Sequence, residues 1–420
     1  MSTLLPGPNI EIETALGIGS ASRAGVWDAA AWDGNVWANP DTALGDWVDI
    51  TCYTLDGVSL GAGTQSADGV VTRWEAATCA FDVYGEAFDP RSGPWAGLLG
   101  PSIPVRVRWR LPGANAWVVA FLGYTDDEGF TYDPKTKRAH LASTDATRIF
   151  NAFDGLEQPA QGQGETAAER VTRIADMVGW DVAARDITPG GVAVQSTTLA
   201  QNAWTLLLAV ADTDLALLWI NRAGQLAYRP QGKVNPNRAL GVIVACDDTD
   251  APDGAVLVRP VQMEGQQPTI TRNIVSISRQ QIDGDSADTP RTVTVRDEAS
   301  TERYLPHTYS RTDLIHLDDN WSTRVANAVI QANAWPADSP ASSEFDTRLD
   351  LGAGPLLLGL EPSLSVVVSD GTRQWLCEPA GWNVNIYRTR IEGTITWLDV
   401  TAWFGAAWDS ANWDEDRWAF

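Results

Sequence analysis

Alternation of apolar and polar residues, typical of a strand with one buried face, recurs in two separate parts of the chain. Gly, Pro and Asp residues, which favour turns, separate the alternating runs. The runs in the first part are 73–84, 105–110, 117–126 and 139–144. Those in the second part are 273–279, 291–296, 356–360, 363–368, 374–378, 381–388 and 390–398. The pattern predicts two small antiparallel β-barrels.

Between the two parts the apolar residues follow the spacing of helices. Those of 165–178 share one helix face, and Gly179 is expected to end this helix. A second helix is expected over 198–211, followed by a hairpin over 215–230. A further helix, over 319–333, lies within the second alternating part. The middle of the chain therefore predicts a helix-helix-hairpin domain.

Together these patterns predict a mainly β fold with an inserted α+β region, in which two small antiparallel β-barrels flank the helix-helix-hairpin domain. A chain of 420 residues is long enough for two or three cores. The expected segments are an N-terminal arm (1–46), a first barrel (47–155), an inserted α+β domain (156–235), a second barrel with one helix (236–403) and a C-terminal tail (404–420).

Both ends of the chain carry a repeat in which Trp recurs every five residues and is followed mostly by Asp. This spacing fits neither one helix face nor one strand face, and the Asp and Gly residues favour tight turns. Each repeat either packs on its own barrel or docks on a neighbouring subunit, because Trp buries a large area in cores and interfaces alike. The second interpretation makes the repeat tryptophans candidate interface residues: Trp27, Trp32, Trp37, Trp408, Trp413 and Trp418.

The formal charge of −24 argues against tight nucleic-acid binding, because that affinity comes from basic side chains neutralising phosphates. No apolar run reaches membrane-spanning length, and no signal peptide follows Met1. Synthesis in a reducing bacterial cytoplasm is therefore expected. The four cysteines are scattered without metal-binding spacing, which predicts buried free thiols at Cys52, Cys79, Cys246 and Cys377.

The sequence shows no catalytic constellation, so we expect no enzyme, no cofactor and no metal. The three histidines have no metal-ligand spacing, and neither a Gly-x-Ser-x-Gly elbow nor a phosphate loop occurs. His140 lies in a predicted strand as a packed or surface residue, whereas His307 and His316 lie in a polar loop and are expected to be solvated. In the acidic stretch 247–254, Pro252 takes the place of a calcium ligand, which favours a solvated turn.

Several short motifs occur in an order that resembles phage tail baseplate-hub and minor tail proteins. In the first alternating part they are Phe88-Asp89-Pro90, Gly100-Pro101, Phe121-Leu122-Gly123-Tyr124 and Asp145. Later motifs are the Ile-Asn-x-x-Gly-x-Leu turn at 220–226 and the run 297–304, after which Leu305 replaces the family's usual Gly. The terminal Trp-Asp repeats are similar to repeats in tail proteins of phages that infect actinobacteria.

The resemblance implies a structural virion protein, a homotrimeric hub at the distal tail tip of a siphophage. Two barrels in three copies would present six similar barrels to a sixfold ring of distal tail protein, and threefold features to the other tip proteins. The resemblance also implies that DNA passes through the lumen during ejection. The alternative is a Trp-rich carbohydrate-binding module or a cell-wall glycan hydrolase of a tail tip, because sugar rings stack on exposed aromatic side chains and close carboxylate pairs are not excluded.

Overall fold

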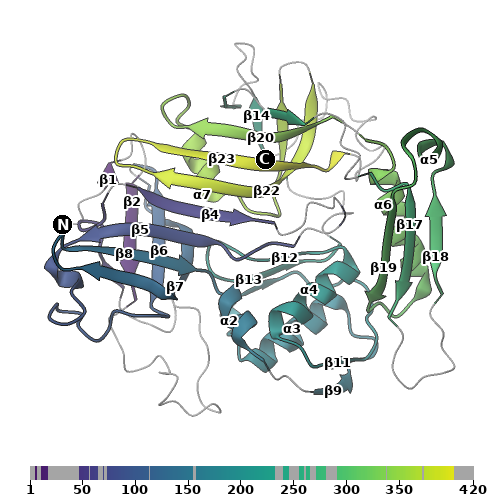
Figure 1. Cartoon of the computed structure of the whole chain (residues 1–420), viewed down its shortest axis with the longest axis horizontal. Helices are drawn as coiled ribbons and strands as arrows, with labels where there is room; N and C mark the ends of the chain where they lie inside the picture. The colour runs from purple at the N-terminus through teal and green to yellow at the C-terminus, as the bar shows by residue number, and fades with distance from the viewer. Residues whose placement is uncertain are drawn as a thin grey trace.

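The fold is mainly β, and one large, mostly antiparallel sheet runs through it (Figure 1). This computed structural model describes residues 5–6, 11–17, 47–55, 57–64, 70, 73–112, 114–154, 158–231, 240–245, 255–259, 262–264, 271–280, 291–336, 338–370 and 373–401. Both Trp-Asp repeats, the acidic stretch 247–254 and Cys246 lie outside these described residues.

The first half of the large sheet contains most of the first alternating part. Its central order is β5 (Thr78–Tyr84), β8 (Arg138–Thr144), β7 (Val118–Asp133) and β6 (Pro104–Arg110). Beyond β6 lie β2 (Glu11–Leu16), β1 (Leu5–Pro6) and β3 (Val48–Asp49). The alternation in β5 buries every second side chain, Cys79, Phe81 and Val83, against the core.

The second half repeats the same central order. It contains β20 (Ser339–Asp346), β23 (Ile391–Asp399), β22 (Gln374–Ile386) and β21 (Ser365–Ser369), each antiparallel to the next. The short strands β14 (Leu240–Ala245), β15 (Val256–Leu257) and β16 (Gln262–Glu264) extend its edges. The two halves of the large sheet therefore share one strand order.

Strand β4 (Val58–Gly63) pairs with β5 on one side and with β22 on the other, so the two halves form one continuous sheet. No closed barrel occurs among the described residues. In the first half, the segment after β3 crosses from β2 to β5. The Ile50 amide donates to the Thr14 carbonyl, and the Leu55 amide donates to the Asp82 carbonyl.

A helical module lies below the sheet in Figure 1. It is built from α2 (Thr147–Ala152), α3 (Ala167–Val178), α4 (Ala203–Asp214), η2 (Val182–Ala184), the pair β9 (Gln158–Gln161) and β11 (Thr197–Leu199), and the sheet β10 (Arg185–Ile187), β13 (Leu226–Arg229) and β12 (Leu217–Ile220). The two predicted helices are present as α3 and α4, and β12 and β13 after them pair antiparallel within a sheet that also contains β10. Helix α3 begins with a capping box between Thr166 and Glu169 and ends at left-handed Gly179.

The second predicted helix begins later than its apolar pattern indicated. Residues 197–199 form β11, and the Asn202 side chain accepts a hydrogen bond from the Thr205 amide, which caps α4. The apolar pattern predicts a helix start at residue 198 because the apolar residues of the helix continue back into β11. Helix α4 also extends three residues past the predicted end at 211.

Another small sheet stands at the right of Figure 1. Its order is β18 (Val293–Arg296), β17 (Ile274–Arg279) and β19 (Thr308–Leu314), and α6 (Asp319–Asn333) packs on it. The predicted helix over 319–333 and the predicted pairing of β17 with β18 are confirmed. These strands, however, form a sheet of their own and do not join the large sheet. Between β18 and β19 lies α5 (Glu298–Tyr304), after the N-cap Asp297.

Two further predictions need correction. The pattern predicts a strand over 356–360, but three of the four leucines of this run lie in α7 (Ala353–Gly359), where Leu357 and Leu358 are buried against the large sheet. A short apolar run is typical of a buried helix as well as of a buried strand, so its periodicity does not distinguish the two. The runs 374–378 and 381–388 form the single strand β22, with a register shift after Pro379. The η1 turn (Glu86–Phe88) follows β5.

The buried end of α4 connects the helical module to both other parts. The Asp212 carboxylate accepts from Arg73, in the loop before β5, and from Arg311 of β19. The adjacent Thr213 carbonyl accepts a 2.7 Å hydrogen bond from the Trp321 indole of α6. Because a buried carboxylate needs its partners, these contacts hold the large sheet and the β18–β17–β19 sheet to the end of α4.

Candidate functional site

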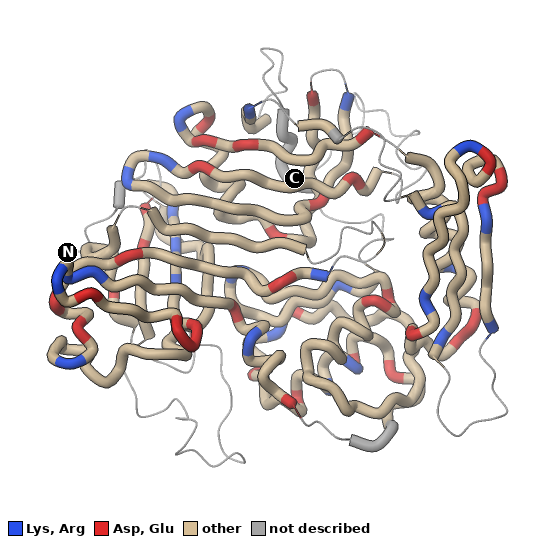
Figure 2. Tube along the Cα trace, viewed as in Figure 1, with Lys and Arg blue, Asp and Glu red and all other residues tan. Residues whose placement is uncertain are grey.

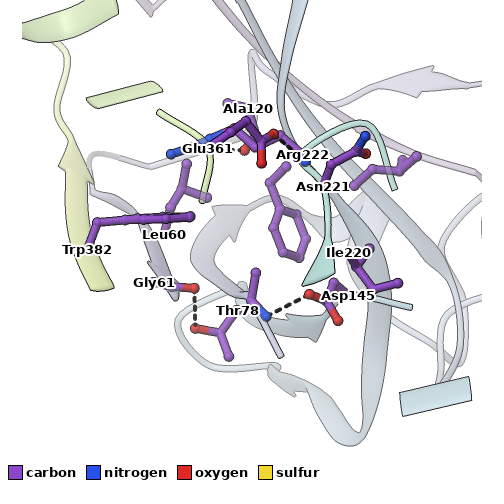
Figure 3. A pocket seen from close by; sticks show the side chains of 13 residues that line it. Leu60, Gly61, Thr78, Ala120, Asp145, Ile220, Asn221, Arg222, Glu361 and Trp382 are labelled. Atoms are coloured by element: carbon purple, nitrogen blue, oxygen red, sulfur yellow. Dashed lines mark hydrogen bonds between the residues drawn. The ribbon is translucent and has the colours of Figure 1, made fainter. Parts of the chain in front are cut away.

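The six predicted interface tryptophans, Trp27, Trp32, Trp37, Trp408, Trp413 and Trp418, lie outside the described residues, so their docking on other subunits stays a prediction. The described residues instead bring together several of the motifs that resemble hub proteins. These motifs surround one pocket where both halves of the sheet meet the β12–β13 hairpin (Figure 3). The pocket encloses about 350 Å³, part of which is open solvent.

Arg222, in the turn between β12 and β13, is the central side chain of this junction. Its Nη1 donates to the Ala120 carbonyl of β7 (3.1 Å), while Nε and Nη2 donate to the Leu360 and Leu357 carbonyls at the end of α7 (both 2.9 Å). The guanidinium also lies 4.8 Å from the centre of the Trp382 ring of β22. One side chain of the helical module therefore binds both halves of the large sheet.

Glu361 provides the opposite charge. Its carboxylate accepts from the Arg222 backbone amide (2.9 Å) and from the Trp219 indole (2.8 Å). Burial raises the pKa of Glu361, and burial lowers the pKa of Arg222 to about 10. The two charges lie in one enclosed place, so each reduces the cost of burying the other.

The Ile-Asn-x-x-Gly-x-Leu motif has a direct explanation at this junction. The Asn221 side chain accepts from the Gln225 amide (2.9 Å), which closes the hairpin turn. Gly224 has φ +76°, and a Cβ there would lie 2.7 Å from the Leu122 side chain. Only glycine combines that backbone conformation with so close an approach to β7. The motif therefore shapes a contact between the hairpin and the sheet.

Asp145 forms another wall of the pocket. Its carboxylate accepts from the Ala77 amide (2.7 Å) and the Thr147 amide (2.8 Å), which ties the end of β8 to the residues before β5. Burial raises the pKa of Asp145 to about 6. Asp145 directly follows β8, the last strand of the first half along the chain.

The charged groups of the pocket are bonded to the protein itself, so the arrangement acts as a structural joint. Arg222, Glu361 and Asp145 all have protein partners inside the junction. Within the described ranges, no group of three or more His, Cys, Asp or Glu side chains is placed to hold a metal ion. The chemistry that this site supports is therefore the joining of chain segments.

The prediction of a solvated His316 is wrong. The ring is fully buried between the helical module and α6, and its Nε2 lies 3.1 Å from the Ser322 hydroxyl. Burial lowers the pKa of His316 to about 4. The pair does not form a nucleophilic site, because Ser322 is also fully buried and no carboxylate binds the His316 Nδ1. No local pattern around His316 indicates this burial, because it arises from the pairing of His316 with the distant Val194.

The other histidines and the cysteines were predicted in part. His140 is exposed beside Asp82 of the neighbouring strand, as a surface residue, whereas His307 is half-buried, not solvated. Cys79 and Cys377 are buried free thiols whose pKa is raised by burial, as predicted. Cys52 is exposed, contrary to the prediction, because it lies in the turn after β3.

Comparison with known proteins identifies the fold. No protein-family model matches the chain, and no curated protein matches it. The tail protein from Neisseria meningitidis MC58 superposes with a TM-score of 0.54 at 9 % identity, over 94 % of this chain and 99 % of that one. The two proteins therefore share their fold along nearly their whole lengths.

Two other solved tail proteins give lower scores. The 43 kDa tail protein of prophage MuSo2 from Shewanella oneidensis has a TM-score of 0.49 at 12 % identity, over 85 % of this chain and 97 % of that chain. Prophage tail protein gp18 from Listeria monocytogenes EGD-e has a TM-score of 0.48 at 11 % identity, over 84 % of this chain and 91 % of that chain.

Among the described helices, none is both long and apolar enough to cross a membrane.

Replacing Arg222 should destabilise the protein strongly. Arg222→Met removes the guanidinium but leaves the Glu361 carboxylate and three carbonyls buried without it. We expect a loss of about 3–5 kcal/mol in the free energy of unfolding, measured by urea denaturation. Arg296→Met, at an exposed ion pair with Glu298, is the control and should change it by about 0.5 kcal/mol or less. A loss below about 1 kcal/mol for Arg222→Met would contradict the central role of this side chain.

Burial of His316 predicts a stability loss in acid. The neutral ring is favoured in the folded protein, where Arg279 also disfavours protonation and only Asp318 and Asp319 favour it. The contribution of the neutral His316 ring to the free energy of unfolding is complete above the unfolded-state pKa of 6.5. It declines by about 3 kcal/mol as the pH falls towards 4.

Urea denaturation between pH 7.5 and pH 4.5 checks this expectation. His316→Gln should flatten the decline, since glutamine does not titrate, whereas His140→Gln, at an exposed site, should leave it unchanged. An identical pH profile for the wild type and His316→Gln would show that this histidine does not control acid stability.

Proposed function

We propose that this chain is a structural virion protein, a baseplate hub or minor tail protein at the distal tip of a siphophage tail. The observation that carries the proposal is the fold shared with a tail protein over 94 % of this chain and 99 % of the other. The junction at Arg222 supports it, since its polar groups are engaged in holding the parts of the chain together.

The proposed hub is a homotrimer that joins the sixfold tail tube to threefold tip components. Each chain contains two β units with the same strand order, so three chains would present six similar units to a ring of distal tail protein. Other tip proteins would bind the threefold side. The protein would be made in the bacterial host's cytoplasm and reside in the virion.

The charge of −24 fits a channel through which DNA leaves the virion. An acidic lumen would repel phosphates, so that DNA passes during ejection and does not bind. Acidic and basic positions both occur across the described chain (Figure 2), so the proposal concerns the surface that faces the trimer axis.

A carbohydrate-binding or glycan-hydrolysing function is the second candidate, and the described tryptophans do not favour it. Sugar stacking requires exposed rings, whereas nine tryptophans are buried in the cores: Trp74, Trp109, Trp180, Trp204, Trp219, Trp321, Trp375, Trp382 and Trp397. Trp335, which is 47 % exposed, bonds to Asp297 and stacks edge-on with Tyr304. The abundance of Trp is therefore explained first by packing.

The oligomeric state tests the proposal. Light scattering on the purified protein and on isolated tail tips should give a mass of three chains in the assembled tip. A monomer in dilute solution would not contradict the proposal, because assembly can require neighbouring subunits. A single copy per virion would refute the homotrimer and with it the adaptor role.

The terminal Trp-Asp repeats are proposed to dock on neighbouring subunits. Deleting residues 404–420, which contain Trp408, Trp413 and Trp418, should leave a folded protein whose melting temperature falls by about 2 °C or less, because these tryptophans would be buried mainly by other chains. The truncated protein should nevertheless fail to enter tails. A deletion that unfolds the isolated chain would assign the repeat to its own core.

A further inference from the structure

Leu305, directly after α5, has a strained backbone conformation. Its φ is +68° and its ψ is 166°, a combination that is essentially confined to glycine because a Cβ is crowded there. The leucine side chain is 71 % exposed, so its burial in this chain does not offset the strain. Strained residues of this kind are concentrated at binding sites, which directs attention to what surrounds Leu305.

The buried side chain of Asn273 holds Leu305 in this conformation. Its Nδ2 donates to the Leu305 carbonyl (2.8 Å), and its Oδ1 accepts from the His307 amide (2.7 Å). Asn273 lies directly before β17, so the strained residue is fixed to the β18–β17–β19 sheet. The chain therefore presents the Leu305 side chain to solvent on a rigid support.

A second exposed apolar side chain lies beside Leu305. Trp335, which follows α6, is 47 % exposed. Its indole donates to the carboxylate of Asp297, the N-cap of α5 (3.0 Å), and its ring meets the Tyr304 ring edge-on, with the ring centres 5.7 Å apart. The orientation of the indole is thus fixed while much of its surface stays open. We call Tyr304, Leu305 and Trp335 the α5 corner.

The C-terminal segment leaves the large sheet next to the α5 corner. The hydroxyl of Thr401, the last described residue, accepts from the Leu376 amide (3.0 Å). The indole of the adjacent Trp375 donates to the carbonyl of Asp338 (3.1 Å), which lies three positions after Trp335. Strand β23 also ends on the side of the large sheet that faces the β18–β17–β19 sheet (Figure 1).

We propose that the α5 corner binds the C-terminal Trp-Asp repeat, residues 408–418, of a neighbouring copy of this chain. Nineteen residues follow Thr401, and such a segment reaches about 60 Å when fully extended. A rotation that relates two copies keeps every height along the rotation axis, so a neighbouring tail begins close to the height of this corner. The indole rings of the repeat would pack against Leu305 and the open surface of Trp335.

This inference rests on the proposed docking of the repeats on neighbouring subunits and names the surface that receives the C-terminal one. In a closed ring of identical chains, each chain would give its tail to one neighbour and receive the tail of the other. The contact would therefore tie every copy to the next.

Leu305→Gly tests the corner, because it relieves the strain and deletes the exposed side chain. The purified variant should melt at a higher temperature than the wild type, since glycine adopts this conformation without strain. Its amount in purified tails should nevertheless fall by about tenfold or more. Leu305→Asn, which keeps a Cβ, should be depleted as well. Val182→Ala removes an apolar side chain that is 73 % exposed in η2 and, as the control, should enter tails normally.

Photo-crosslinking in assembled tails tests the occupant. The probe p-benzoylphenylalanine takes the place of the exposed Arg303, whose guanidinium lies 5.2 Å from the centre of the Tyr304 ring. It should crosslink to a peptide within residues 402–420, in a product with the mass of two chains. A crosslink to this segment within one chain would overturn the assignment to a neighbouring copy. A crosslink to another tail protein, or none at all, would overturn the repeat as occupant.

The outcomes also separate this inference from the proposed function. Normal entry of Leu305→Gly and Leu305→Asn into tails would overturn the role of the α5 corner and leave the hub function intact. Absence of the wild-type protein from the tail tip would overturn both.

Discussion

The architecture depends on one buried cation. A guanidinium that is removed from water must find hydrogen-bond acceptors and a compensating charge, and Arg222 finds them only where three segments meet. Its acceptors come from β7 in one half of the sheet and from the end of α7 in the other half. Glu361 supplies the opposite charge. Neither half can move away from the hairpin without leaving polar groups unpaired.

A second buried charge extends this constraint to the small sheet. Asp212, at the end of α4, binds Arg73 on one side and Arg311 on the other, so the helical module is fixed to the large sheet and to β19. The hairpin and α4 thus connect the large sheet, the β10–β13–β12 sheet and the β18–β17–β19 sheet through ionic hydrogen bonds. Such connections resist relative motion of the parts, which suits a protein proposed to join the tail tube to the tip components.

The sequence was sufficient where the signals were local. The helix over 319–333 and the end of α3 at Gly179 were predicted from periodicity and capping residues, and the β12–β13 hairpin was predicted from its turn residues. It was insufficient where contacts join distant residues. The pairing of β4 with β22 links positions more than 300 residues apart, and it turns two predicted barrels into one open sheet. The burial of His316 likewise depends on a segment far away in the chain. At the candidate site, the sequence motifs include Asn221, Gly224 and Asp145. Arg222, which holds the junction, occupies a variable position of the Ile-Asn-x-x-Gly-x-Leu motif, so the motif does not indicate its role.

The central claim, that this chain is the threefold adaptor of a tail tip, is tested most directly by cryo-electron microscopy of intact tails. The account predicts three copies below the last sixfold ring, arranged around a continuous channel, with the two halves of each large sheet facing adjacent ring subunits. A map that shows six copies, or that places the chain away from the tail axis without a channel, would contradict it.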